Sequence, residues 1–155
     1  MKSVLVLCTG NSARSQMAEG LLKSLTDGRF EVESAGTKPS IVRPEAIAAL
    51  AEIGIDISGN RSKSVDEFAS REFDFVLTVC DNAKENCPYF PAKTRVIHRM
   101  FEDPADAGGD FETRVAVIGA GMAGAHVAEA DDEYLDFIRQ CALPVNRLID
   151  EISRS

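Results

Sequence analysis

The apolar positions near the N-terminus predict a buried strand followed directly by a helix. Val4 to Leu7 form a continuous apolar run that ends at Cys8, which is typical of a strand buried on both faces of a parallel sheet. From residue 12 to residue 25 the apolar side chains recur on one side of a helical pattern. A tight loop around Gly10 is therefore expected between the two elements.

Strand and helix patterns continue to alternate along the chain. Three further segments have the character of strands, residues 30–35, 74–79 and 94–97. Pro44 is expected to begin a second helix that ends near Gly54. This alternation predicts an α/β fold with a four-stranded parallel sheet flanked by helices.

The ends of the predicted strands carry residues that can do chemistry. Ligands of open parallel sheets bind beyond the carboxyl ends of the strands. Cys8, Cys80 and the segment after Ile97 all fall at this edge. The last 22 residues add apolar positions at steps of three and four, which predicts a long amphipathic helix.

Composition narrows the class of protein. A chain of 155 residues with 45% apolar residues suits a single domain over residues 1–155. Neither a signal-peptide pattern nor an apolar run of the roughly 20 residues needed to cross a bilayer is present, so a cytoplasmic protein is expected. Four cysteines in a chain of this length indicate reactive or packed thiols rather than a disulfide scaffold.

The charge distribution argues against nucleic acid as a partner. Residues 1–99 hold 13 Lys or Arg and 13 Asp or Glu, whereas residues 100–155 hold 4 and 12, which together give the net charge of -8. Nucleic-acid binders present a basic patch or stripe, and this sequence has no such cluster. An anion must therefore be bound locally, by the geometry of a small site.

The loop from Cys8 to Ser15 has the composition of an oxyanion site. Its members are Cys8, Thr9, Gly10, Asn11, Ser12, Ala13, Arg14 and Ser15. Backbone N–H groups of such a turn and the positive end of the following helix can surround a tetrahedral anion. Arg14 offers a planar fork for two oxygens, and the same field favours the nucleophilic thiolate of Cys8. A buried thiol and a surface arginine, which meet this spacing by chance, are the alternative.

The segment CTGNSARSQMAEG resembles the signature of the low-molecular-weight phosphatase fold, and within it of the thioredoxin-coupled arsenate reductases. The resemblance continues through residues 34–36, 55–58, 78–88 and 103–104. It implies a three-layer sandwich around the parallel sheet. The phosphatase branch usually has Pro where this chain has Gln16.

The resemblance also implies a relay of three thiols. Cys8 would form a thiol-arsenate adduct, Cys80 would attack it and release arsenite, and Cys87 would resolve the disulfide. Thioredoxin would then reduce the Cys80–Cys87 disulfide, so that no bound cofactor or metal is expected. Two unrelated buried thiols remain the alternative for Cys80 and Cys87.

Two further roles are implied by the same resemblance. Asp103, which precedes Pro104, would be the general acid that protonates the leaving oxygen; a turn-forming aspartate is the alternative. Some family members bind potassium beneath the loop through residues that match Asn11, Glu19, Ser34 and an aspartate at position 63. Because Lys63 stands there, its ammonium could replace the ion and leave little potassium dependence, unless it is simply an exposed lysine.

Residues 105–130 are a Gly- and Ala-rich insertion that is atypical of the family. They include VAVIGAGMAG at 115–124, which resembles a dinucleotide-binding turn. Only 31 residues follow Gly124, too few for the rest of a nucleotide-binding unit, so no such cofactor is expected.

The sequence thus predicts an arsenate reductase that binds an arsenate- or phosphate-like oxyanion and thioredoxin. A monomer without nucleic-acid or membrane partners is expected. Two alternatives stay open: a phosphatase that uses Cys8, Arg14 and Asp103, and a non-catalytic oxyanion-binding or redox-sensing module.

Overall fold

A computed structural model of the chain describes residues 1–79, 92–98 and 110. Strands and helices alternate through these residues, as the apolar pattern predicts. The elements are β1 Lys2–Cys8, α1 Arg14–Thr26, β2 Phe30–Gly36, α2 Pro44–Ala51, the short 3₁₀ helix η1 Val65–Phe68, β3 Phe73–Thr78 and β4 Ala92–His98.

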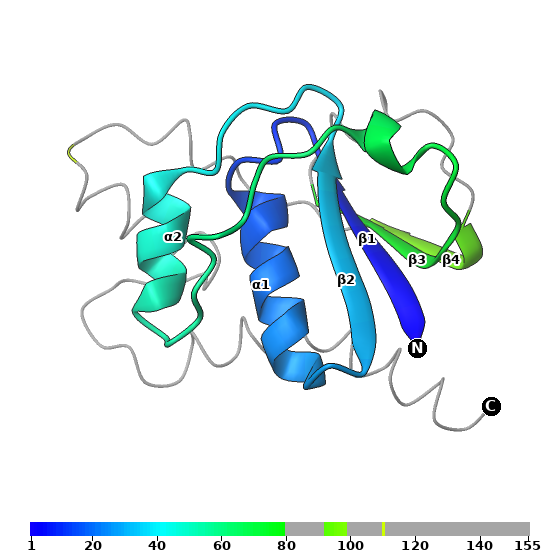
Figure 1. The fold of residues 1–155 in the computed structure, drawn as a ribbon, viewed down its shortest axis with the longest axis horizontal. Coiled ribbons are helices and arrows are strands. Elements are labelled where there is room, and N and C mark those ends of the chain that lie inside the picture. Colours follow the sequence, from blue (N-terminus) through cyan, green and yellow to red (C-terminus); the bar gives the residue numbers. More distant parts are fainter. Residues whose placement is uncertain (80–91, 99–109, 111–155) are drawn as a thin grey trace.

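The strands form one parallel sheet in the order β2-β1-β3-β4 (Figure 1). The chain adds β2 on one side of β1 and then β3 and β4 on the other, so the direction of winding reverses beside β1. Crevices at such reversal points, beyond the carboxyl ends of the strands, are where ligands bind in open α/β sheets. Cys8 is the last residue of β1 and therefore lies at this point.

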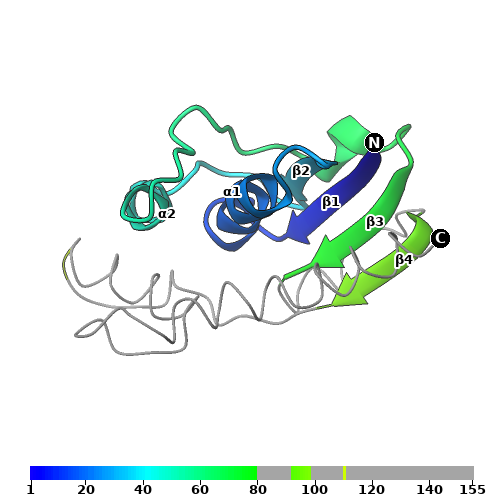
Figure 2. The ribbon, with the colours of Figure 1, turned by 90° about the horizontal axis from the view of Figure 1, so that it is seen from below.

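The sheet is covered on both faces. On one face an apolar cluster joins β1, β2 and β3 to Ala18 and Leu22 of α1. On the other face Leu5 and Leu7 of β1 pack with Val65 and Phe68 of η1 and its surroundings. Helix α2 packs against the outer side of α1 and not on the sheet (Figure 2). The predicted α/β class with a four-stranded parallel sheet is confirmed.

The boundaries differ from the predicted ones in informative ways. The first helix begins at Arg14 and not at residue 12, because residues 9–13 form a separate loop. The second helix ends at Ala51 and is followed by a turn in which Gly54 has φ 78°. The 3₁₀ helix η1 has no counterpart among the predicted elements. The predicted C-terminal helix and the insertion at 105–130 lie outside the described residues, apart from Asp110.

Within the described ranges, none of the helices has both the length and the apolar character required to cross a bilayer.

Candidate active site

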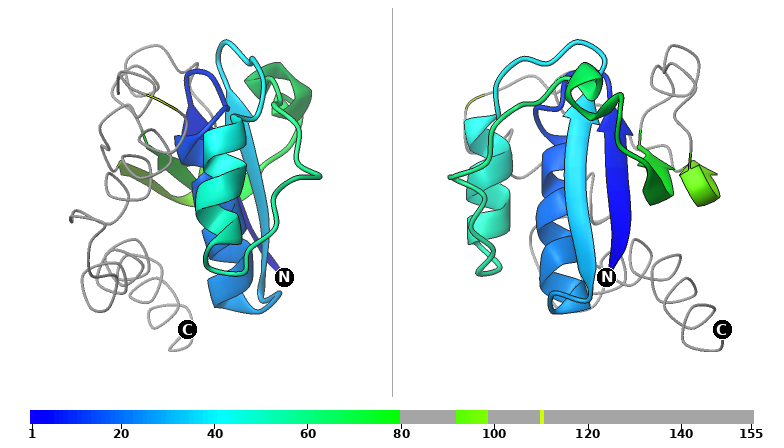
Figure 3. Two further views of the ribbon diagram at one scale, coloured as in Figure 1. Left: turned by 90° about the vertical axis from the view of Figure 1, so that its left-hand side faces the viewer. Right: turned by 45° about the vertical axis from the view of Figure 1, so that its right-hand side comes forward.

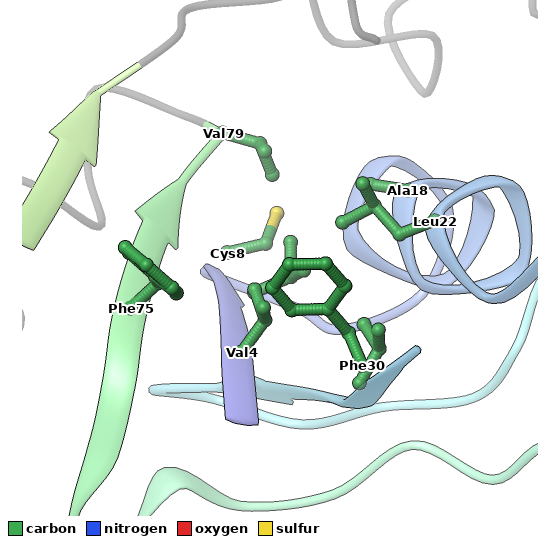
Figure 4. Packing of buried hydrophobic residues seen from close by; sticks show 9 residues of the cluster. Val4, Cys8, Ala18, Leu22, Phe30, Phe75 and Val79 are labelled. Atoms are coloured by element: carbon green, nitrogen blue, oxygen red, sulfur yellow. The ribbon is translucent and has the colours of Figure 1, made fainter. Parts of the chain in front are cut away.

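Cys8 lies at the base of the candidate site. Cys8 is 4% exposed and belongs to the apolar cluster between the sheet and α1. Figure 4 shows its sulfur beside Val79, with Ala18 and Leu22 of α1 close by. Apolar burial by itself disfavours a thiolate, so a reactive Cys8 requires compensating positive charge or N–H donors from the loop above it.

The loop that follows Cys8 directs its carbonyl groups outward. The carbonyls of Cys8, Thr9, Gly10 and Ser12 accept hydrogen bonds from the backbone N–H groups of Thr37, Lys38, Ser40 and Arg43, at 3.3, 2.8, 3.1 and 2.9 Å. The carbonyl of Asn11 accepts from the side chain of Gln16 at 3.2 Å. Figure 3 shows this loop and the 37–43 segment at the same end of the sheet.

These outward carbonyls determine where the amide groups point. No cis peptide bond occurs in the described residues, and in a trans peptide the N–H points opposite to the carbonyl of the same plane. The N–H groups of residues 9–13 are therefore turned toward the interior of the loop, as in anion-binding nests.

Asn11 gives the loop its sharp turn and is fully buried. Its φ of 45° lies in the left-handed region, which Asn adopts more readily than other non-glycine residues. Its Nδ2 donates to Ser15 Oγ and to Ser34 Oγ, both at 2.9 Å. Its Oδ1 accepts from the Lys63 backbone N–H at 2.8 Å and from Gln16 Nε2 at 2.9 Å. The turn is thus held by α1, β2 and the 60–63 segment.

Gly36 allows the loop to lie against β2. A Cβ atom at this position would be 2.5 Å from the Thr9 carbonyl oxygen and 2.9 Å from the Asn11 backbone nitrogen. Both neighbours are backbone atoms, so any side chain would displace the loop. Glycine at this position is a steric requirement of the loop.

Arg14 occupies the first position of α1 and is half-buried. Ala13 at the N-cap makes no side-chain capping bond, and the first turn contains no acidic residue. The positive end of the helix is therefore not neutralised by its own side chains and faces the loop. A guanidinium and a helix N-terminus at one loop form a suitable environment for a tetrahedral anion.

Glu19, Ser34 and Lys63 lie in contact beneath Asn11. Ser34 Oγ donates to Glu19 Oε2 at 2.5 Å. The Lys63 ammonium is 3.5 Å from the same oxygen and 2.5 Å from Glu33 Oε2. The Lys63 and Glu19 side chains are only 12% and 2% exposed. The four residues matched to an ion site by resemblance are therefore adjacent, with an ammonium among the carboxylates.

Three of the predicted functional residues, Cys80, Cys87 and Asp103, lie outside the described residues. The residue before Cys80 is described: the Val79 backbone N–H donates at 3.0 Å to the carbonyl of Leu7, next to Cys8 in sequence.

Gln16 and Asn60 were missed as site residues by sequence reasoning. Gln16 Nε2 donates to Asn11 and to the Arg61 carbonyl, and Asn60 Nδ2 donates to Gln16 Oε1. No local signal in the sequence marked Gln16, because this residue lies away from the apolar stripe of Met17, Leu21 and Leu22, and its burial is visible only in the structure. A buried amide at this position requires polar partners.

Comparison with known proteins identifies the class. Residues 3–112 match the model of the low molecular weight phosphotyrosine protein phosphatase family, which is most of the chain. The chain therefore belongs to this family, as the signature segment predicted.

Within the family, the chain is similar to several arsenate reductases. An arsenate reductase of Halalkalibacterium halodurans is 43% identical over 116 residues, 75% of this chain and 84% of that protein. A solved arsenate reductase in a phosphate-binding state is 33% identical with a TM-score of 0.65, covering 91% of this chain and 99% of the other. A thioredoxin-dependent arsenate reductase of Corynebacterium glutamicum is 28% identical with a TM-score of 0.55, covering 76% and 56%.

Proposed function

We propose that this protein reduces arsenate to arsenite in the cytoplasm with electrons from thioredoxin. The observation that carries the proposal is the loop of residues 9–13 directly after Cys8, whose outward carbonyls turn its N–H groups toward the interior of the loop. Arsenate and phosphate are both tetrahedral oxyanions. The solved arsenate reductase in a phosphate-binding state supports an oxyanion site in this fold.

The first step binds arsenate and forms an adduct. The inward N–H groups, the start of α1 and the Arg14 guanidinium hold the oxyanion and favour the Cys8 thiolate. The thiolate forms a bond from sulfur to arsenic while one arsenic–oxygen bond breaks. Asp103 gives its proton to the departing oxygen, which leaves as water.

The next steps transfer two electrons. The Cys80 thiolate attacks the Cys8 sulfur, and the electron pair of the sulfur–arsenic bond stays on arsenic. Arsenic(V) becomes arsenic(III) and leaves as arsenite, while a Cys8–Cys80 disulfide forms. The Cys87 thiolate then attacks the Cys80 sulfur and releases the Cys8 thiolate, leaving a Cys80–Cys87 disulfide.

A thiol reductant must restore the enzyme, and we propose thioredoxin. Its two thiols would reduce the Cys80–Cys87 disulfide by exchange, in a compartment where thiols remain reduced. The thioredoxin-dependent relative from Corynebacterium glutamicum supports this choice. The reaction as proposed uses no bound cofactor.

The proposal is tested by NADPH consumption with arsenate, thioredoxin and thioredoxin reductase. The wild type should turn over, and the Cys87→Ser variant should stop after one disulfide is formed. Cys141→Ser is the matched control, because it also removes one thiol but should keep turnover. Turnover that survives in Cys87→Ser would refute the relay.

The alternative is a phosphatase that uses Cys8, Arg14 and Asp103. One observation favours it. The segment from Cys8 to Arg14, called the anion loop from here on, holds the nucleophile, the inward N–H groups and the arginine that a phosphatase requires, and lacks only the acid. It needs neither Cys80 nor Cys87. Robust aryl phosphate hydrolysis, unchanged in a Cys80→Ser and Cys87→Ser double variant and without arsenate turnover, would establish it.

We also propose that the Lys63 ammonium takes the place of a bound potassium ion. Its position between Glu19 and Glu33, linked through Ser34 to Asn11, supports this role. Turnover should be the same in potassium and sodium chloride at equal ionic strength, whereas Lys63→Asp should become potassium-dependent. Strong potassium activation of the wild type would refute the replacement.

A further inference from the structure

We propose that Gln16, supported by a hydrogen bond from Asn60, is a positioning residue that keeps the anion loop in its binding conformation. The inference rests on the proposed function, in that the loop is taken to bind an oxyanion. It concerns a side chain that contacts neither the anion nor the Cys8 thiol in the proposed mechanism. Its role would be to fix the direction of one peptide group of the loop.

The Gln16 amide joins three parts of the chain. Nε2 lies 2.9 Å from Asn11 Oδ1, 3.2 Å from the Asn11 carbonyl oxygen and 2.9 Å from the Arg61 carbonyl oxygen. The residue is fully buried on the first turn of α1. Three acceptors around one NH₂ group in a buried site favour a donor that water cannot replace.

Asn60 completes the hydrogen bonding of the Gln16 amide at its oxygen. Asn60 Nδ2 donates to Gln16 Oε1 at 3.0 Å, which is possible only when the Gln16 oxygen points away from Asn11. Asn60 itself is anchored, because its backbone N–H donates to the Ile57 carbonyl at 3.0 Å. The three oxygens around Nε2 and the Asn60 donor at Oε1 together favour one orientation of the Gln16 amide.

The consequence for the loop follows from the peptide plane between Asn11 and Ser12. Gln16 holds the Asn11 carbonyl outward, and so the Ser12 N–H is turned inward. Asn11 also has the left-handed φ of 45°, a conformation that an isolated chain populates rarely. Without the Gln16 donor, the Asn11 carbonyl would lose the hydrogen bond that holds it outward, so this peptide could rotate and the Ser12 N–H could turn away from the anion.

The test compares three variants of the full chain. Gln16→Met keeps the length of the side chain and removes its donors. Asn60→Ala removes only the donor to the Gln16 oxygen, and this variant provides the test if Gln16→Met does not fold. Ala49→Gly is the control, because it weakens buried α2 but touches none of these polar groups.

Two measurements separate positioning from general stability. Calorimetric titration with inorganic phosphate reports the anion site, and the pH dependence of iodoacetamide alkylation, followed on the Cys8 peptide by mass spectrometry, reports the thiolate. Gln16→Met should bind phosphate about tenfold more weakly and shift the alkylation midpoint to higher pH. Asn60→Ala should shift both in the same direction by less, and Ala49→Gly should match the wild type.

Phosphate affinity within about twofold of the wild type and an unchanged alkylation midpoint in both Gln16→Met and Asn60→Ala would overturn the proposal. Equal losses in Ala49→Gly would also overturn it. Neither readout needs arsenate turnover, so a wild type that binds phosphate without reducing arsenate refutes the proposed reaction alone. A wild type that binds no phosphate would refute both.

Discussion

Arg61 and Lys63 are two residues apart on one extended segment, yet their charges serve different parts of the molecule. Arg61 pairs with Glu67 at the surface, where the side chains are 65% and 41% exposed. The Lys63 side chain is only 12% exposed, and it contacts Glu33 and the buried Glu19. Exposed pairs contribute little to stability, whereas breaking a buried pair leaves an uncompensated charge. One segment thus has a loop-facing side and a surface-facing side.

The loop-facing side also connects by backbone to the anion loop. The Lys63 N–H donates to Asn11 Oδ1, and the Lys63 carbonyl accepts from the Gly36 N–H at 2.9 Å. A change at Lys63 should therefore affect the site more than a change to the exposed Arg61 side chain, because Arg61 contacts the site network through its backbone carbonyl, at Gln16. The predictions below test this contrast, beginning with the largest effect.

Replacing Lys63 by Met should destabilise the protein by roughly 3 kcal/mol, because Glu19 and Glu33 lose the ammonium between them. Lys23 still pairs with Glu19, which keeps the loss at the lower end of the range for broken buried pairs. Urea unfolding at pH 7 measures the effect. Adding Glu19→Gln to Lys63→Met should recover part of the stability. A loss no larger than that of Arg61→Met would remove the contrast between the two sides.

Gly36→Ala should cost about 1 to 3 kcal/mol, because the new Cβ meets backbone atoms of the anion loop. Phosphate affinity should also fall, since the loop must move. Gly59→Ala is the matched control: a Cβ there meets nothing within 4 Å. If unfolding and phosphate titration gave equal results for both variants, the loop would not depend on the close approach of β2.

The periodic elements were predictable, because their patterns are local. β1 appeared as an apolar run and α1 as apolar side chains on one face, and the structure places both within two residues of the expected bounds. The helix α1 begins later than predicted because the carbonyls of residues 9–12 accept hydrogen bonds from the 37–43 segment and from the Gln16 side chain. They do not accept from backbone N–H groups of the helix. That competition involves residues far apart in sequence, which no local pattern contains.

Several residues of the site could be predicted from the sequence, but most of their hydrogen-bond and ion-pair partners could not. The loop from Cys8 to Arg14 was recognisable from the types of its residues and the strand, turn and helix around it. The partners of this region were not predictable, since Ser62 bonds to the Gly10 carbonyl and Asn60 to Gln16 only after the chain has passed through β2 and α2. Glu33 as a partner of Lys63 was equally hidden, because a charged residue in a strand is ordinarily a solvated one.

Breaking the exposed Arg61–Glu67 pair should have the smallest effect on stability, and the size of that effect should depend on pH. Hydrogen bonds from Arg61 and from the Ser64 backbone lower the pKa of Glu67 from 4.5 to about 2. A lowered pKa stabilises the folded state above the unfolded value, so this contribution is complete above pH 4.5 and is lost as pH falls toward 2. Glu67→Gln keeps an acceptor for the Ser64 N–H and removes the charge.

The melting temperature of Glu67→Gln should therefore be slightly below that of the wild type at pH 7 and low salt. The difference should shrink with added salt, because salt screens the ion pair. It should vanish as pH falls toward 2, because protonation of Glu67 removes the pair. Thermal unfolding of the wild type, Arg61→Gln, Glu67→Gln and the double variant from pH 2 to 7 isolates the pair from other carboxylates. A coupling that is as large as the effect of Lys63→Met, or that does not change with pH, would show that the surface pair belongs to the same network as the anion loop.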